Sequence, residues 1–149
     1  MVWTPHGTVA TIVEKDGKFL LVKELSSNGK EVYNQPAGHI EADEPVLDAA
    51  IRETIEETGY TVSINKFIGM YIYKAPSNGV IYHRYCFSAT EESYNPNAEL
   101  DNGIIGACWM TLDEIKAQPE KMRSPLVLKC IEDYLNRPHL PLDVIYELI

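Results

Sequence analysis

Three glutamates stand near the end of one predicted helix, at Glu53, Glu56 and Glu57. Their spacing of i, i+3 and i+4 places all three side chains on one side of an α-helix. Like charges at this spacing repel each other, and carboxylates at the C-terminal end of a helix also oppose its dipole. A hard divalent cation such as Mg²⁺ or Mn²⁺ binds carboxylate oxygens and would offset both costs. The residues alone therefore indicate metal-assisted hydrolysis of a phosphate ester or anhydride.

Two more residues are suited to the same site. Arg52 precedes Glu56 by four residues, so an ion pair could orient that carboxylate. Gly38 lies in the loop before the helix, where a glycine permits close backbone approach. The alternative interpretation is a solvated acidic helix face, or a surface network between an acidic helix end and an arginine. Periodicity by itself leaves that alternative open.

The helix that positions these groups is predicted between Pro45 and Gly59. Asp43 or Glu44 is suited to cap it, and Pro45 suits the first turn, where a missing N–H loses no partner. Gly59 is suited to end it in the left-handed conformation. Apolar residues at helical spacing define the face that we expect to be buried, namely Val46, Leu47, Ala50, Ile51 and Ile55.

Strands are predicted where β-branched and aromatic residues gather between turn signals. The dipeptide Asp16–Gly17 and the segment 76–79 each predict a tight turn between two strands. The polar, acidic segment 90–103 is predicted as a loop. The predicted strands cover residues 7–13, 18–24, 31–34, 61–64, 67–74, 80–89 and 104–110.

Two further helices are predicted after the last strand. Thr111 and Glu114 form a capping box that opens a short helix, and another helix is predicted over residues 123–136. The tail 138–149 ends in an apolar run that we expect to dock on the body. Because helices and strands do not alternate regularly, a doubly wound parallel sheet is not expected. We predict a single domain over residues 1–149, of the α+β class, with a mixed sheet between helices in an α/β/α sandwich.

Composition and charge restrict the partners. The net charge of −9 argues against binding a nucleic-acid polymer, because that affinity comes from Lys and Arg on phosphates. No apolar run approaches the roughly 18 residues that a membrane span needs. We see no signal peptide and therefore expect a cytoplasmic protein, with no membrane partner and no particular oligomeric state predicted. The three cysteines form no CxxC pair and are predicted to be buried free thiols, at Cys86, Cys108 and Cys130.

The segment 38–59 begins and ends with glycine and carries the pairs Arg52–Glu53 and Glu56–Glu57. Together with Glu44, these residues stand at a spacing that resembles the Nudix box of the Nudix hydrolases. The resemblance extends over nearly the whole chain, including the N-terminal hairpin and the strand that carries Trp109. It implies the Nudix fold and a metal-dependent hydrolase.

Two positions depart from the box, which has aliphatic residues where this chain has Thr54 and Tyr60. Both are packing positions, so the departures concern the docking of the helix more than the metal site. Within the family, residues 34–44, 123–127 and 141–143 look like the corresponding runs of the NudJ-type phosphatases. Those enzymes are associated with hydrolysis of hydroxymethylpyrimidine and thiamine pyrophosphates and of nucleoside di- and triphosphates, with release of orthophosphate.

The resemblance implies roles for particular residues. Glu53, Glu56 and Glu57, with the carbonyl of Gly38, would bind Mg²⁺, for which Mn²⁺ could substitute. Arg52 would orient a ligand glutamate. One of the glutamates, or a loop carboxylate, would act as general base on the attacking water. Support of the loop before the helix would fall to Glu44. An extra carboxylate could come from Glu99 or Asp101, although a solvated loop charge is the favoured alternative for each.

Substrate contacts are predicted outside the box. Alternation along a strand places Arg84 on one face with Tyr82, where it could bind a phosphate or simply face solvent. Arg123 and Ser124 open the last helix and could also meet phosphate, although capping alone explains Ser124. Weaker candidates are Trp3, Tyr33, Tyr71 and Tyr73 for stacking on a pyrimidine, and His6, His39 and Lys23 for other contacts.

The implied function is hydrolysis of the phosphoanhydride bonds of small nucleoside di- or triphosphates or pyrimidine pyrophosphates, with water as nucleophile. One alternative is a Nudix hydrolase of ADP-ribose or a nucleotide sugar. Another is a non-catalytic module that senses a nucleotide. The intact set of Glu53, Glu56 and Glu57 argues against the sensor, because a binding module need not keep metal ligands.

Overall fold

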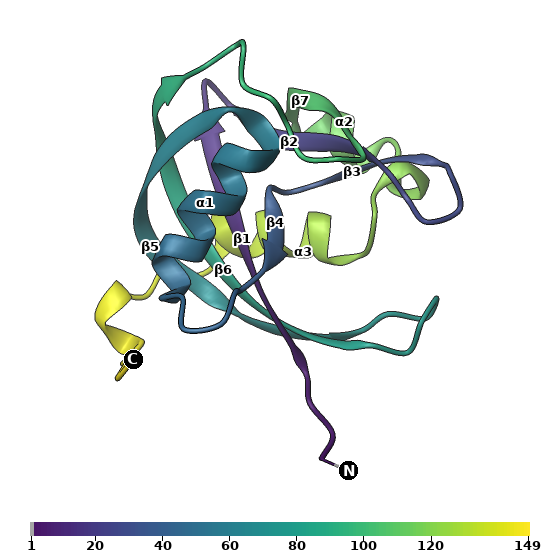
Figure 1. Ribbon diagram of the computed structural model, residues 1–149. Helices are drawn as coiled ribbons and strands as arrows, with labels where there is room; N and C mark the ends of the chain where they lie inside the picture. The colour runs from purple at the N-terminus through teal and green to yellow at the C-terminus, as the bar shows by residue number, and fades with distance from the viewer. Residues whose placement is uncertain (1) are drawn as a thin grey trace.

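A mixed sheet lies at the centre of the computed structural model, which describes residues 2–149 (Figure 1). Its main path has the strand order β3-β2-β1-β6-β5, while β4 pairs with β1 and β7 pairs with β2. β1 runs parallel to β6 and antiparallel to β2 and β4. The strands are β1 (His6–Lys15), β2 (Lys18–Leu25), β3 (Glu31–Asn34), β4 (Ala37–His39), β5 (Tyr60–Lys74), β6 (Ile81–Tyr94) and β7 (Ile104–Thr111).

Helices cover both faces of this sheet (Figure 1). Successive residues of β1 point to opposite faces, so Val9 packs with α1 while Ala10 and Ile12 pack with α3. The predicted α/β/α arrangement is therefore confirmed. The helices are α1 (Val46–Thr58), α2 (Leu112–Lys116) and α3 (Leu126–Asn136), with short 3₁₀ turns η1 (Pro119–Lys121) and η2 (Leu142–Val144). None of the helices in residues 2–149 has the length and apolar character needed to cross a membrane.

Local turn and cap signals predicted the structure well. Asp16 and Gly17 both adopt positive φ, of 53° and 75°, as the two-residue hairpin turn between β1 and β2 requires. Gly59 ends α1 in the left-handed conformation with φ of 78°. The capping box of Thr111 and Glu114 is present at the start of α2. All three cysteines are free thiols; two are buried and Cys108 is half-buried.

The strand boundaries were partly wrong. The strands predicted at 61–64 and 67–74 are one strand, β5, whose pairing with β6 shifts register at three places. Each irregularity interrupts the alternation of side chains, which made the sequence look like two strands. β6 also continues to Tyr94, so the first residues of the predicted loop 90–103 are paired with β5. The short strand β4 was not predicted as a strand.

The buried face of α1 also differs from the prediction. Val46 and Ala50 are buried as expected, but Leu47 and Ile51 are only partly buried, and Ile55 is 38% exposed. The helix is rotated so that small, polar and acidic side chains face inward. They are Ala49, Glu53, Thr54, Glu57 and Thr58.

A pair of buried hydroxyls explains the first of the two departures from the Nudix box. The Oγ1 atoms of Thr54 and Thr11 lie 2.9 Å apart, and Thr54 Oγ1 donates to the Ala50 carbonyl at 2.8 Å. Neither threonine is exposed to solvent. Thr11 therefore donates to Thr54, and the hydroxyl on β1 accounts for a threonine where an aliphatic residue is usual.

We expect the substitution Thr54→Val to lower the free energy of unfolding by about 1–2 kcal/mol, because it leaves the Thr11 hydroxyl buried without this partner. The double substitution Thr11→Val, Thr54→Val should lose less than the sum of the two single losses. Urea unfolding of the four proteins in the cycle measures this coupling. Strictly additive losses would contradict the pairing.

The N-terminus of α1 is capped from the far end of the chain, and the predicted caps Asp43 and Glu44 do not cap it. Pro45 occupies the N-cap position without a side-chain bond, and the Val46 N–H donates to Glu147 Oε2 at 3.0 Å. Asp43 instead adopts a left-handed turn with φ of 61°. Glu44 does not serve as the cap because its carboxylate binds an arginine within the helix, as described below.

The tail docks on the body, as expected. Phe67 and Leu140 exchange two backbone hydrogen bonds, of 2.8 and 2.9 Å, and Leu142 and Ile145 pack on the core beneath α1. Leu148, beyond this contact, is 99% exposed. The docked part of the tail therefore ends with the cap that Glu147 provides.

Removing this cap should weaken the fold measurably. We expect Glu147→Ala to lower the free energy of unfolding by about 1 kcal/mol, since an N-terminal N–H of α1 and the positive end of its dipole lose an acidic partner. Glu99→Ala removes an exposed loop glutamate and is the matched control. Chemical denaturation of both variants tests the difference, and equal effects would contradict a capping role.

Candidate active site

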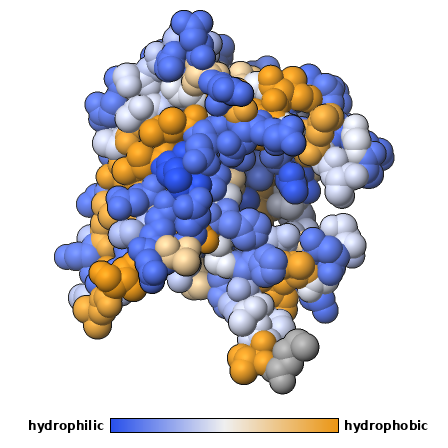
Figure 2. Space-filling view, in the orientation of Figure 1, coloured by the Kyte–Doolittle hydropathy of each residue, from blue (hydrophilic) through white to orange (hydrophobic). Residues whose placement is uncertain are grey.

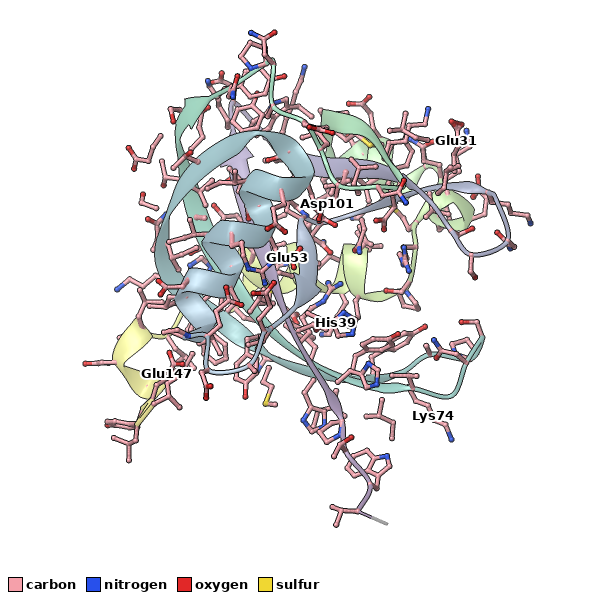
Figure 3. The ribbon with its side chains drawn as sticks, viewed as in Figure 1. Glu31, His39, Glu53, Lys74, Asp101 and Glu147 are labelled. Atoms are coloured by element: carbon pink, nitrogen blue, oxygen red, sulfur yellow. The ribbon has the colours of Figure 1, made fainter. Side chains whose placement is uncertain are left out.

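A cleft of about 630 Å³ lies between α1, the start of α3 and the β5–β6 hairpin. The surface over α1 beside it is largely hydrophilic, whereas apolar residues gather along the margin of this face (Figure 2). Glu53 and Glu57 reach the cleft from α1, and Gly38 and His39 reach it from β4. In Figure 3 the labelled residues Glu53, Asp101 and His39 lie on the side of α1 that faces the cleft, and the labelled Lys74 lies on the β5–β6 hairpin.

Three carboxylates converge at the end of α1. Glu53, Glu56 and Asp101 each offer an oxygen, and these oxygens all lie within 4.8 Å of one another. The backbone N–H of Asp101 donates to the Glu56 carbonyl at 3.0 Å, which fixes the loop against the helix. Of the two loop carboxylates considered from the sequence, the structure brings Asp101 into this cluster and not Glu99. Sequence spacing gave no basis for choosing between them.

Glu57 lies outside that group of three, on the buried side of the helix. Its Oε1 accepts a hydrogen bond from the Ala37 N–H at 2.8 Å. Burial raises the pKa of Glu57 to about 8; the Ala37 bond counteracts this rise, and the charges of nearby carboxylates including Glu24 and Glu53 add to it. Burial also raises the pKa of Glu53, against the opposing effect of Arg52.

This donor set fits a hard divalent cation. Oxygen ligands from several carboxylates are what Mg²⁺ and Mn²⁺ prefer. A cation among Glu53, Glu56 and Asp101 would offset the mutual repulsion of these carboxylates and the burial that disfavours the charged form of Glu53. Glu57, which follows Glu56 directly and lies about one helical turn after Glu53, lines the cleft.

Arg52 holds the glutamates in place. Its Nη1 donates to Glu53 at 2.8 Å and to Glu56 at 3.0 Å, while its Nε and Nη2 bind both oxygens of Glu44 at 2.7 and 3.0 Å. Nη2 also donates to the His39 carbonyl at 3.0 Å. These bonds, above all those to Glu44, raise the pKa of Arg52 far above its usual value. The arginine thus joins the loop before the helix to two carboxylates of the cluster.

Gly38 is in contact with the carboxyl group of Glu53. A Cβ atom at position 38 would overlap the carboxyl carbon and both oxygens of Glu53. The backbone conformation at Gly38 is one that any residue can adopt, since its φ is not positive. The glycine is therefore required by the space that the Glu53 carboxylate occupies and not by the backbone.

The cleft also contains a buried arginine. Arg84 is only 6% exposed, so the alternative of a solvated sheet face is wrong. Its Nη1 donates to Gln35 Oε1 at 3.0 Å and to Cys130 Sγ at 3.7 Å, and its Nη2 donates to Asn34 Oδ1 at 3.4 Å. Gln35 is anchored in turn on the Val127 carbonyl of α3 at 2.6 Å. Arg84 is thus a positioned cation on the cleft wall.

The comparisons with known proteins agree with this geometry. A model of the Nudix domain matches residues 4–129. The chain belongs to the Nudix family. Phosphatase NudJ of Escherichia coli K12 is 40% identical over 144 residues, which are 97% of this chain and 92% of that relative. The chain is therefore a Nudix hydrolase similar to that phosphatase.

Solved structures give the same result. A Nudix hydrolase of Nitrosomonas europaea is 41% identical and superposes with a TM-score of 0.95, over 97% of this chain and 98% of that one. An ADP-ribose pyrophosphatase of Streptococcus suis superposes with a TM-score of 0.65 over 92% of this chain and 96% of that one. At 18% identity, this second protein shows that the fold is shared and no more.

Two other predicted substrate contacts of this Nudix hydrolase lie at the cleft and also have partners within the protein. Arg123 and Ser124 line the cleft. Arg123 Nη1 donates to Glu24 Oε1 at 2.9 Å, which partly neutralises both groups. Ser124 Oγ accepts a hydrogen bond from the Leu126 N–H at 3.2 Å, so it supports the first turn of α3.

Only some of the aromatic and histidine candidates lie at the cleft. Tyr73 and His39 line the cleft, as does Tyr82. Tyr71 is not a cleft residue, because its hydroxyl donates to Asp133 at 2.8 Å and it packs against the core. The remaining candidates lie off the cleft: Trp3 is largely exposed, Tyr33 packs on the core, His6 contacts His39, and Lys23 pairs with Glu31.

Proposed function

We propose that this Nudix hydrolase cleaves phosphoanhydride bonds of small nucleoside di- or triphosphates or pyrimidine pyrophosphates, with water as nucleophile. The observation that carries the proposal is the cluster of Glu53, Glu56 and Asp101 beside a cleft that also contains the guanidinium of Arg84. A cluster of acids suits a metal, and a buried cation across the cleft suits phosphate. The similarity to the phosphatase NudJ supports the same class of substrate.

Mg²⁺, with Mn²⁺ as a substitute, is the proposed cofactor. Glu53, Glu56 and Asp101 would hold it, with Glu57 and the Gly38 carbonyl as further ligands. Bound there, the cation would neutralise charge on the phosphoryl oxygens and lower the pKa of the attacking water.

The protein's own groups orient the reactants. Arg52 holds the carboxylates of Glu53 and Glu56 in one arrangement through bonds of 2.8 and 3.0 Å. The proton from water would pass to Glu57, which lines the cleft, or to Glu56 or Asp101 in the adjoining cluster. Arg84 binds a phosphoryl oxygen of the substrate, because its bonds to Gln35, Cys130 and Asn34 use three of its five N–H groups. Arg123 and Ser124, which line the cleft just before the start of α3, would provide further contacts to the substrate phosphates.

The direct test is release of phosphate from a panel of substrates with Mg²⁺ and with excess EDTA. The panel contains hydroxymethylpyrimidine pyrophosphate, nucleoside di- and triphosphates, and ADP-ribose and a UDP-sugar for the alternative substrates. We expect turnover of the first two groups that EDTA abolishes, with orthophosphate as product. Nucleotide binding without turnover of any substrate would favour the sensor and overturn the proposal. A cytoplasmic location also stays a prediction.

A further inference from the structure

We propose that Tyr73 and Tyr82 form a shelf on which a planar heteroaromatic ring of the substrate stacks, while the attached phosphates reach Arg84 and the acidic cluster. This inference rests on the proposed function and adds what selects the organic part of the substrate. The name tyrosine shelf is used below for these two side chains.

Strand pairing places the two tyrosines side by side. Tyr73 on β5 and Tyr82 on β6 are direct cross-strand partners, so their side chains project from the same face of the hairpin. Both are half-buried and both line the cleft. The hairpin that bears them extends beyond the rest of the sheet, on the side where His39 and Glu53 face it (Figure 3).

Neighbouring groups hold one ring of the shelf in a defined orientation. The Tyr82 ring contacts His6 edge-on at 5.7 Å and His39 at 6.2 Å between ring centroids. Its hydroxyl accepts a hydrogen bond from Asn78 Nδ2 at 3.4 Å. An aromatic surface that is already ordered loses little conformational entropy when a ligand ring stacks on it. Asn78 also lines the cleft, where its amide can meet polar atoms at the ring edge.

The order of residues along β6 matches a ring joined to phosphate. Arg84 follows Tyr82 by two residues on the same strand face and is far more buried. Two residues of a strand span about 7 Å, so the stacking surface and the buried cation lie along one line into the cleft. Tyr71, the next tyrosine on the same face of β5, is held by Asp133 and serves the core instead. The ligand class is therefore a planar heteroaromatic ring with a di- or triphosphate at one end.

The test separates the ring from its phosphates. Dissociation constants are measured by titration calorimetry in excess EDTA, which is expected to stop turnover. The ligands are CTP and inorganic tripolyphosphate, which has no ring, and the proteins are wild type, Tyr73→Leu and Tyr82→Leu. We expect each leucine variant to reduce the preference for CTP over tripolyphosphate by about 10- to 100-fold, as expected for loss of stacking on one aromatic side chain. Tyr73→Phe and Tyr82→Phe keep the ring and should retain the preference within about threefold.

The matched control is Tyr146→Leu, which makes the same change at an 87%-exposed position on the tail. Because the two shelf positions are tested separately, a folding defect in one variant leaves the other informative. An unchanged preference in the leucine variants, or an equal loss in the phenylalanine variants, would overturn the shelf. If wild type hydrolyses ring-bearing phosphates but shows no preference for CTP over tripolyphosphate, the shelf is wrong and the proposed function stands. If wild type hydrolyses none of them, the proposed function itself fails.

Discussion

Glu56→Gln is expected to lower kcat/KM by about 10³-fold, a loss of roughly 4 kcal/mol of transition-state stabilisation. The change keeps the size of the side chain but removes one of the three charges that converge at the end of α1. Glu56 is only half-buried, so the fold should survive the substitution. Steady-state kinetics with Mg²⁺ measure the loss, and Mn²⁺ titration should show weaker binding of the ion.

Two further variants make this result specific. Glu57→Gln removes the buried carboxylate beside the cluster and should also reduce turnover strongly. Asp48→Asn removes an exposed carboxylate from the first turn of the same helix and is the matched control, with activity within about twofold of wild type. Unchanged turnover in both glutamine variants would contradict the proposal that this helix holds the metal.

Gly38→Ala should reduce kcat/KM by about 10²-fold while the protein remains folded. The new methyl group would take the space of the Glu53 carboxyl group, which lies at the end of a flexible side chain and can move away. A displacement of about 1 Å in a group that positions the reaction is enough for a loss of this size. Kinetics and thermal unfolding, measured on the same preparation, separate the effect on activity from any effect on stability.

Gly106→Ala is the matched control for that substitution. Gly106 also lies in a strand with an ordinary backbone conformation, but a Cβ atom there would meet no atom within 4 Å in the described chain. Its activity and stability should therefore stay close to those of wild type. If Gly38→Ala is as active as Gly106→Ala, the contact with Glu53 does not matter for the reaction. If Gly38→Ala fails to fold, the carboxylate cannot move aside as we expect.

Features specified by a few neighbouring residues were predicted from sequence. The turn at Asp16–Gly17 needs positive φ at both positions, and Asp-Gly is one of the pairs that tolerate it. Gly59 marks the end of α1 and the Thr111–Glu114 box marks the start of α2, in each case through hydrogen bonds between residues no more than four positions apart. The glutamates proposed as metal ligands could be singled out because their spacing lies within a single helix.

Features that depend on distant partners were not predictable in this way. Periodicity assumes that buried positions are apolar, so it favoured Ile55 and missed Thr54 and Glu57. Those two side chains are buried because Thr11 and the Ala37 N–H supply partners from other parts of the chain. A hydrophobicity pattern contains no information about such partners.

The residues of the cleft also show that sequence patterns do not reveal tertiary contacts. Alternation placed Arg84 and Tyr82 on one strand face, but it could not tell that α3 would bury Arg84 and leave Tyr82 half-open. Asp101 joined the carboxylate cluster through a backbone bond to Glu56 that closes a long loop. Sequence therefore indicated the kind of chemistry, and tertiary contacts determined which residues share the site.

The remote cap on α1 has a consequence for how the enzyme is made. The segment 46–58 is synthesised early, yet its first N–H finds its partner in Glu147, which is added 101 residues after Val46. The edge of β5 likewise receives Leu140 only from the last part of the chain. A nascent chain on the ribosome can thus form most of the sheet while the helix that bears the acidic cluster stays frayed at its start. We expect the first turn of α1 to be completed late in folding, after the tail has docked.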